Sequence, residues 1–358
     1  MSNERRTEKA PNLSRRRLLQ GTVAGSAAVA MFGGGTEAWA AGGVTVAPRF
    51  YPLSPAPQPQ VSLDGKLAVI TGASRGNGRA VGDALVSRHV DVIGTSRNPA
   101  TVRNPPAFPL VQLDVADPAS VATFPARLAA VPAFRRHGGV VDILANNAGR
   151  FVFGNIVPIS PAQTPFYLAQ RDLAVRTLYS GHVMVTNTML PLLSKSSYAR
   201  IIFTVSIASY YTGAALPPLS SLDAYAAGKA ALRTYANNLG AALSGSGSNI
   251  QVSSVHPYVM RTALATHPNP IYTRPVNANG LTGDQPFDDF LGAVRGTLAG
   301  GLDPSMVGET YAQLLSMTAP PLNVAVGSPE FAIQGQNELI TSQVLADNDN
   351  SAIPLVSV

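Results

Sequence analysis

Short apolar runs alternate with longer segments of helical composition between about residue 63 and residue 327. The runs have the length of buried strands, and most of them are followed by polar residues or glycine. Strands that alternate with helices form a mostly parallel sheet flanked by helices, so the pattern predicts an α/β fold. The expected strands are 67–70, 90–97, 110–113, 140–145, 200–206, 250–256 and 322–326.

A long helix is predicted over residues 164–193. Thr164 is a suitable N-cap, and Pro165 stands at the first helical position, where proline is tolerated. A second helix is expected around residues 223–232, which have helical composition. In contrast, residues 263–302 contain several prolines and are expected to be rich in loops.

The turn after the first expected strand, residues 71–78, has the sequence T-G-A-S-R-G-N-G. Gly72 permits a tight turn, Gly76 permits close approach of the backbone to a pyrophosphate, and Gly78 permits the next helix to pack on the strand. The N–H groups and the dipole at that helix N-terminus would then face the anion. The segment is therefore interpreted as a phosphate cradle, with an ordinary strand-to-helix loop as the alternative.

The end of the second expected strand lacks the acidic residue that would bind the 2′-hydroxyl of NAD. Arg97 stands there instead, and Arg75 lies in the glycine turn. Two guanidinium groups can bind a 2′-phosphate, so these residues favour NADP over NAD. The alternative is that both arginines are solvated surface side chains.

The segment 223–232 places Tyr225 and Lys229 one helical turn apart, on the same face. A free tyrosine titrates near pH 10, and a neighbouring cation favours its phenolate form. A lone Y-x-x-x-K is common and carries little information. It gains weight here from Ser206 upstream and from the glycine turn.

Three motifs in this order resemble the short-chain dehydrogenase/reductase family. They are the glycine turn, Asp114-Val115 after the third expected strand, and Asn146-Asn147-Ala148-Gly149 after the fourth. The resemblance covers residues 63–327 and implies a doubly wound Rossmann fold with a seven-stranded sheet in the order 3-2-1-4-5-6-7. The cofactor-binding residues that it implies, together with the arginines above, are Gly72, Ser74, Arg75, Gly76, Asn77, Gly78, Arg97, Asp114, Val115, Asn146, Ala148, Gly149, Tyr225, Lys229 and Thr262.

The resemblance also implies catalytic roles. Tyr225 would exchange a proton with the substrate oxygen, Ser206 would hydrogen-bond that oxygen, and Lys229 would hold the nicotinamide ribose and lower the tyrosine pKa. The separation of Ser206 and Tyr225 is several residues longer than usual in the family, which is expected to reshape the substrate pocket. The resemblance also implies a long substrate lid at about residues 263–302.

The chain departs from the family pattern at two further places. Leu178 occupies the position of a family asparagine that bends a helix and helps a water to extend the proton relay from the lysine, unless the alignment has slipped by one residue. Tyr258 replaces a glycine in the segment that ends at Thr262, which puts the local turn in question.

The overall charge argues against nucleic acid as a partner. Half of the formal net charge of +6 lies in the first 40 residues, so the remainder is only weakly basic. The chain has no cysteine, which excludes disulfides and thiol catalysis. Its five histidines lack metal-ligand spacing and are interpreted as core or surface residues, so no metal is expected.

Residues 1–40 are interpreted as a signal segment. The arginines at 15–17 are followed by leucines and a mild apolar stretch that is too short to span a bilayer. This resembles a bacterial twin-arginine signal, with cleavage after Ala40, recognition by the twin-arginine export machinery and release into the periplasm. A disordered basic tail is the alternative. Residues 41–62 are expected to be a proline-rich arm, and residues 328–358 a polar tail.

The sequence thus predicts an NADP(H)-dependent oxidoreductase that interconverts a secondary alcohol and a carbonyl compound by hydride transfer. The resemblance also implies homodimers or homotetramers, whereas the substrate itself is not indicated. The alternative is an exported, nucleotide-bound sensor or binding protein with the same fold and little catalytic activity.

Overall fold

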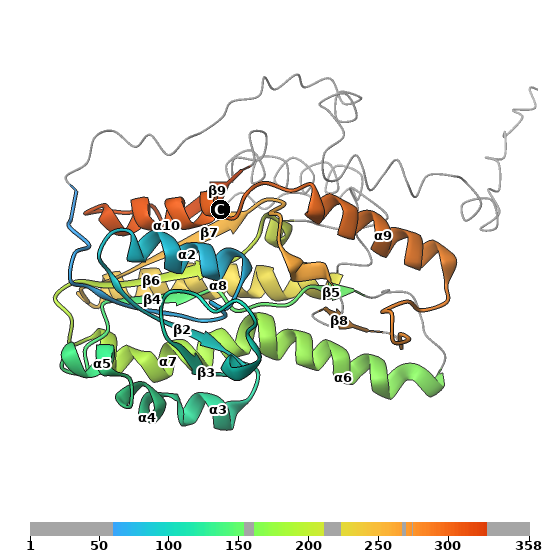
Figure 1. The fold of residues 1–358 in the computed structure, drawn as a ribbon, viewed down its shortest axis with the longest axis horizontal. Helices are drawn as coiled ribbons and strands as arrows, with labels where there is room; N and C mark the ends of the chain where they lie inside the picture. Colours follow the sequence, from blue (N-terminus) through green and yellow to red (C-terminus); the bar gives the residue numbers. More distant parts are fainter. Residues whose placement is uncertain (1–59, 154–160, 211–222, 267–269, 274, 328–358) are drawn as a thin grey trace, which may run out of the picture.

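The protein is described here from a computed structural model, which places residues 60–153, 161–210, 223–266, 270–273 and 275–327. Its centre is a seven-stranded sheet with the order β3-β2-β1-β4-β6-β7-β9, in which every pair of neighbours is parallel (Figure 1). This confirms the predicted fold class and strand order, because β6, β7 and β9 are the fifth, sixth and seventh expected strands. The strands are β1 Leu67–Ile70, β2 Asp91–Ser96, β3 Leu110–Gln112, β4 Ile143–Asn146, β6 Ala199–Thr204, β7 Ile250–Pro257 and β9 Asn323–Val326.

Helices cover both faces of the sheet (Figure 1). Side chains alternate between the faces along a strand. In β1, Leu67 and Val69 therefore join the core beneath one helical layer, and Ala68 and Ile70 join the core beneath the other. One layer holds α2 Gly76–Val86 and α10 Ser305–Ser316; the other holds α3 Pro118–Ala122, α4 Phe124–Ala129, α5 Pro132–Arg136, α7 Gly181–Leu193 and α8 Asp223–Gly245.

The long helix predicted over 164–193 is divided by one wide turn. Helix α6 spans Thr164–Val175, a π-helical turn follows at Arg176–Ser180, and α7 continues the run. The N-cap is Gln163 and not Thr164, because a short 3₁₀ turn, Pro161–Gln163, precedes the helix. π-turns of this kind are rare in helices and occur often at functional sites.

The region 263–302 is more ordered than its prolines suggest. It contains the 3₁₀ turn Ala263–Ala265, strand β8 Ile271–Tyr272 and helix α9 Gln285–Ala299. The expectation of a region made mainly of loops was therefore wrong for its second half. The prolines fall before α9 or in its first turn, where they do not break the helix. Strand β8 pairs with β5 Val152–Phe153 in a second, two-stranded sheet.

Several expectations concern residues outside the described ranges. They are the signal segment 1–40, nearly all of the arm 41–62, most of the long stretch between Ser206 and Tyr225, and the tail 328–358. Within the described ranges, no helix combines the length and the apolar character that a membrane span requires.

Candidate active site

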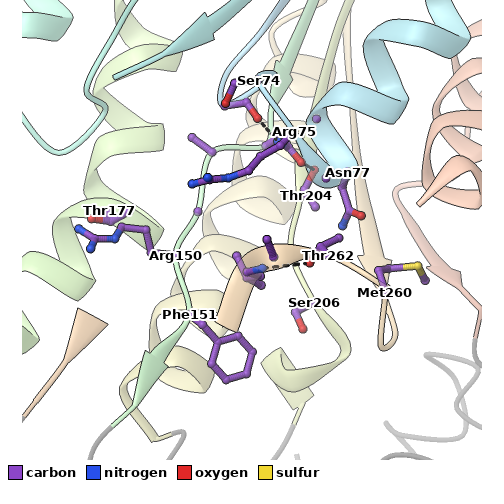
Figure 2. Close-up of a pocket in the computed structure, with 18 of the residues that line it drawn as sticks. Ser74, Arg75, Asn77, Arg150, Phe151, Thr177, Thr204, Ser206, Met260 and Thr262 are labelled. Atoms are coloured by element: carbon purple, nitrogen blue, oxygen red, sulfur yellow. Dashed lines mark hydrogen bonds between the residues drawn. The ribbon is translucent and has the colours of Figure 1, made fainter. Parts of the chain in front are cut away.

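A cavity of about 1010 Å³ opens at the carboxyl ends of the central strands. This is where ligands bind in open parallel sheets. Figure 2 shows Ser74, Arg75 and Asn77 of the glycine turn across the cavity from Ser206 and Phe151. The predicted site residues that line it are Gly72, Ser74, Arg75, Gly76, Asn77, Gly78, Arg97, Asp114, Val115, Ala148, Gly149, Ser206, Tyr225, Lys229 and Thr262. Asn146 does not line the cavity.

The glycine turn has little room for side chains. Gly72 and Gly76 have φ values of +67° and +55°, which side-chain-bearing residues rarely adopt. A Cβ on Gly78 would come within 2.3 Å of the Asn147 amide nitrogen. Helix α2 begins at Gly76, and the side chain of its N-cap, Arg75, makes no capping hydrogen bond. The first N–H groups of the helix are therefore not capped by this side chain, and the residues that carry them, Gly76, Asn77 and Gly78, line the cavity.

One side chain of the glycine turn has a buried polar atom without a hydrogen-bond partner among the described residues. Among the described residues, nothing hydrogen-bonds to the buried Oδ1 of Asn77, which lines the cavity. Buried polar atoms are nearly always paired in folded proteins, so this oxygen is suited to a ligand donor or a water.

Four arginines line one side of the cavity. Burial lowers the pKa of Arg75, and the guanidinium of Arg97 lowers it further. Burial also lowers the pKa of Arg150, with Arg97 and Arg75 acting in the same direction and Asp114 opposing them. The fourth is Arg103; it is exposed, as Arg75 and Arg97 are, whereas Arg150 is half-buried. This concentration of like charge is suited to an anion. The sequence analysis did not identify Arg150, although it directly follows Gly149.

Tyr225 lies near the start of α8 and is almost fully buried. Its ring stacks on Phe151, with ring centroids 4.7 Å apart and planes 21° apart. Burial raises the pKa of Tyr225 to about 12, although a hydrogen bond with Ser206 acts in the opposite direction. Ser206 lies two residues after the end of β6, so the end of a strand and the first turn of a helix bring the two hydroxyls together.

Lys229 lies one turn further along α8 and is almost fully buried. Its Nζ donates a hydrogen bond to the carbonyl oxygen of Thr204, 2.7 Å away. Burial lowers the pKa of Lys229 to about 7. The expectation that this lysine lowers the pKa of Tyr225 stays a prediction, and burial disfavours the ammonium form of Lys229 that would stabilise the phenolate.

The side chain of Thr204 connects the site to α10. Its Oγ1 donates to Asn147 Oδ1 at 3.1 Å and lies 2.6 Å from the hydroxyl of Tyr311, which is fully buried. Asn147 in turn donates to the carbonyl oxygens of Thr71 and Gly72 in the glycine turn. The sequence analysis missed this chain of contacts, because its members lie far apart in sequence and match no motif.

Asn146, the last residue of β4, is fully buried and does not itself line the cavity. Its amide donates to Thr186 Oγ1 at 2.9 Å. His182 lies beside it, with Nε2 2.8 Å from the carbonyl oxygen of Ala148. Burial lowers the pKa of His182 to about 3, so the imidazole is neutral and its Nε2–H can donate to that carbonyl. The pair supports the backbone of the cavity-lining residues.

Leu178 lies in the π-helical turn and is fully buried. It packs on the residue before Lys229: a Cβ on Gly228 would come within 2.9 Å of the Leu178 Cβ. Leu178 Cδ2 and Lys229 Nζ both lie 3.8 Å from the position that a Cβ on Gly149 would take. Leu178 thus faces the lysine side of the site. Its neighbour Thr177 lines the cavity and donates to the carbonyl oxygen of Leu173.

Tyr258 and Thr262 complete the site. The N–H of Tyr258 donates to the carbonyl oxygen of Val326, and its φ is not positive, so the tyrosine fits the turn without strain. Thr262 accepts a hydrogen bond from the N–H of Leu264. A Cβ on Gly76 would come within 3.3 Å of the Thr262 side chain, so this threonine lies against the glycine turn.

Comparison with known proteins identifies the family. A model of the short chain dehydrogenase family matches residues 66–270, which is more than half of the chain. The chain belongs to this family of oxidoreductases.

Two curated relatives illustrate how far the similarity extends. Over 94 residues the chain is 39% identical to the 3-oxoacyl-[acyl-carrier-protein] reductase FabG of Salmonella typhimurium, an overlap of 25% of this chain and 36% of that protein. The match therefore spans only about a third of that reductase. Over 296 residues it is 27% identical to Oxidoreductase BOA17 of Botryotinia fuckeliana, an overlap of 79% of this chain and 95% of that protein.

Solved structures share the fold at low sequence identity. A short-chain dehydrogenase from Streptomyces avermitilis has a TM-score of 0.61, 23% identity, and coverage of 81% of this chain and 98% of its own. One from Burkholderia phymatum, in complex with NAD, has a TM-score of 0.58, 22% identity, and coverage of 83% and 100%. One from Burkholderia cenocepacia, in complex with NADP, has a TM-score of 0.55, 22% identity, and coverage of 75% and 99%.

Proposed function

We propose that the protein is an NADP(H)-dependent oxidoreductase that interconverts a secondary alcohol and a ketone or aldehyde. The observation that carries this proposal is the hydrogen bond between Tyr225 and Ser206 in a cavity that also contains the glycine turn. A proton donor and a dinucleotide cradle in one cavity are what carbonyl reduction needs.

The residues of the cavity fit a dinucleotide. Gly72 and Gly76 have positive φ, which lets the turn curve around a phosphate, and the N-terminus of α2 supplies N–H donors there. Asn77 of the same turn also lines the cavity, and its Oδ1 has no hydrogen-bond partner among the described residues. In addition, solved relatives of the same fold contain NAD or NADP.

The arginines favour NADP over NAD. Arg75 and Arg97 lie close enough for their charges to repel, which a bound phosphate would relieve. The acid that would hold the 2′-hydroxyl of NAD is replaced by Arg97 itself. Charge-assisted hydrogen bonds contribute about 1.5 to 3 kcal/mol each, so even one such contact separates the two cofactors by about tenfold or more.

When bound, the nicotinamide supplies or accepts the hydride. Tyr225 donates a proton to the substrate oxygen during reduction and takes it back during oxidation. Ser206 hydrogen-bonds the same oxygen and holds it beside the phenol. Lys229 provides a positive charge near the phenolate once it is protonated, which its pKa of about 7 permits around neutral pH.

The wall next to Tyr225 is apolar. Its aromatic neighbour Phe151 and side chains from α9 belong to one buried cluster with Tyr225 and also line the cavity. Ligand pockets of this composition select for apolar bodies with few polar groups. We therefore infer that the carbonyl group is carried on an apolar skeleton. The lining residues of this kind are Phe151, Ala208, Val259, Val294 and Leu298.

The proposal is tested by adding NADPH and a panel of apolar, sugar-like and carboxylated ketones and aldehydes to the purified protein, and following the nicotinamide absorbance. Turnover of apolar members is expected. Binding of NADPH without turnover of any carbonyl or alcohol would instead favour a nucleotide-bound sensor. The high pKa of Tyr225 is the one observation that points to that alternative.

A further inference from the structure

Arg150 lines the cavity between two residues that also line it, Gly149 and Phe151. It directly follows the Gly149 backbone and precedes Phe151, which stacks on Tyr225. Its Nη2 donates a hydrogen bond to the carbonyl oxygen of Pro270, just before β8, at 3.2 Å. This hydrogen bond ties the Arg150 side chain to the segment that leads into β8, the strand that pairs with β5 in the small sheet.

The charged groups that act on the pKa of Arg150 follow three adjacent strands of the sheet. They are Arg75 in the turn after β1, Arg97 after β2 and Asp114 after β3. Arg97 also acts on the pKa of Arg75, and all three arginines line the cavity. In the view of Figure 2, the side chains of Arg75 and Arg150 extend toward the same side. Only Asp114 offsets this positive charge among the described residues that line the cavity.

We propose that Arg150 is a third guanidinium that binds the 2′-phosphate of NADP(H), together with Arg75 and Arg97. This inference rests on the proposed function, because it requires a dinucleotide in the cavity. A phosphate monoester carries nearly two negative charges and accepts several charge-assisted hydrogen bonds, which three planar guanidinium groups can supply.

The pyrophosphate is the competing target for Arg150. The glycine turn and the N-terminus of α2 already offer backbone donors to that group. Arg150 instead lies close enough to Arg97 for their charges to interact, in the same cavity, and Arg97 directly follows β2, the strand whose end faces the adenosine ribose in this fold. The two targets make different predictions, because NAD and NADP share the pyrophosphate and differ only in the 2′-phosphate.

The test compares the affinities of NADP⁺ and NAD⁺ by calorimetry for wild type, Arg150→Gln, Arg150→Lys and Arg135→Gln. We expect Arg150→Gln to weaken NADP⁺ binding by about tenfold or more and to change NAD⁺ binding by less than about twofold. Arg150→Lys should fall in between, since it retains the charge without the planar fork. Arg135→Gln removes the same formal charge from an exposed position on α5 that does not line the cavity, and should have a much smaller effect.

Three outcomes would overturn the role of Arg150. They are equal weakening of both cofactors, no weakening of NADP⁺, and equal effects of Arg150→Gln and Arg135→Gln. Adenosine 2′,5′-bisphosphate and 5′-AMP repeat the comparison without a pyrophosphate or nicotinamide, and only the bisphosphate should respond to Arg150→Gln. The wild-type measurement separates the two proposals: if wild type binds neither dinucleotide, the proposed function fails, whereas tight NADP⁺ binding that is insensitive to Arg150→Gln overturns only this inference.

Discussion

Lys229 donates a hydrogen bond from Nζ to the carbonyl oxygen of Thr204, 2.7 Å away. The side chain of the same threonine joins Asn147 and Tyr311. The last residue of β6 therefore orients the lysine through its backbone and supports the glycine turn through its hydroxyl. This relationship makes the lysine, the glycine turn and helix α10 parts of one buried network.

Removal of the Thr204 hydroxyl should destabilise the protein. In Thr204→Val, Asn147 Oδ1 loses its donor and the buried Tyr311 hydroxyl loses its partner, and each unpaired group costs about 1 to 3 kcal/mol. We expect a lower free energy of unfolding by chemical denaturation and weaker dinucleotide binding. Thr204→Ser retains the hydroxyl and serves as the control. Equal stability of Thr204→Val and wild type would contradict the network.

Buried Lys229 should make stability depend on pH. Its pKa falls from 10.5 to about 7 on folding, so between these values the unfolded chain binds a proton that the folded protein does not. The free energy of unfolding should therefore rise with pH in this window, by up to about 1.4 kcal/mol per pH unit. The measurement is best kept below pH 10, because above it the raised pKa of Tyr225 acts in the opposite direction.

Denaturation curves from pH 7 to 9.5 check this dependence. Lys229→Met should reduce the slope of stability against pH, whereas Lys195→Met, at an exposed position, should leave it unchanged. Parallel slopes for wild type and Lys229→Met would show that Lys229 is not desolvated in the folded protein.

The sequence predicted the parts of the fold that depend on local pattern. Buried runs such as 67–70 predict strands because both faces of the sheet are covered, and the glycine turn is recognisable because Gly72 and Gly76 need positive φ. The i,i+4 spacing of Tyr225 and Lys229 likewise places both on one face of α8.

Features that depend on tertiary contacts could not be predicted. The partners of Thr204 come from α10 and from the residues after β4. The role proposed for Arg150 depends on its nearness to Arg97, which follows β2, two strands away from β4 in the sheet. Helix α9 was missed because prolines upstream of it dominated the local pattern. The desolvation that shifts the pKa of Lys229 is likewise a property of the packed site and has no sequence signature.

Leu178 is expected to limit proton exchange. It is fully buried on the lysine side of the site and offers no donor or acceptor. We expect Leu178→Asn to retain the fold, to lose about 1 to 3 kcal/mol of stability, and to raise turnover at neutral pH if proton relay limits the rate. Leu178→Met, which stays apolar at similar size, is the control. Identical pH profiles of kcat for Leu178→Asn and wild type would show that the relay does not limit turnover.

We also propose that the protein is exported in folded form with its dinucleotide bound, because free NADP is not available outside the cytoplasm. Mass spectrometry of the exported protein should find Ala41 at its N-terminus and a bound nucleotide. Replacement of Arg16 and Arg17 by lysine keeps the charge of the signal and should retain the protein in the cytoplasm. Cytoplasmic wild type with an intact Met1 would contradict export, and exported protein without nucleotide would contradict cofactor retention.

The most direct test of the central claim, that Tyr225 is the proton donor, is the turnover of Tyr225→Phe with NADPH and the best apolar carbonyl substrate. General acid-base groups contribute about 10² to 10⁴-fold, so kcat should fall by that factor while NADPH affinity stays close to wild type. Tyr179→Phe removes the same hydroxyl from a tyrosine that does not line the cavity and should retain wild-type turnover. Wild-type kcat in Tyr225→Phe would contradict the assignment of the active site.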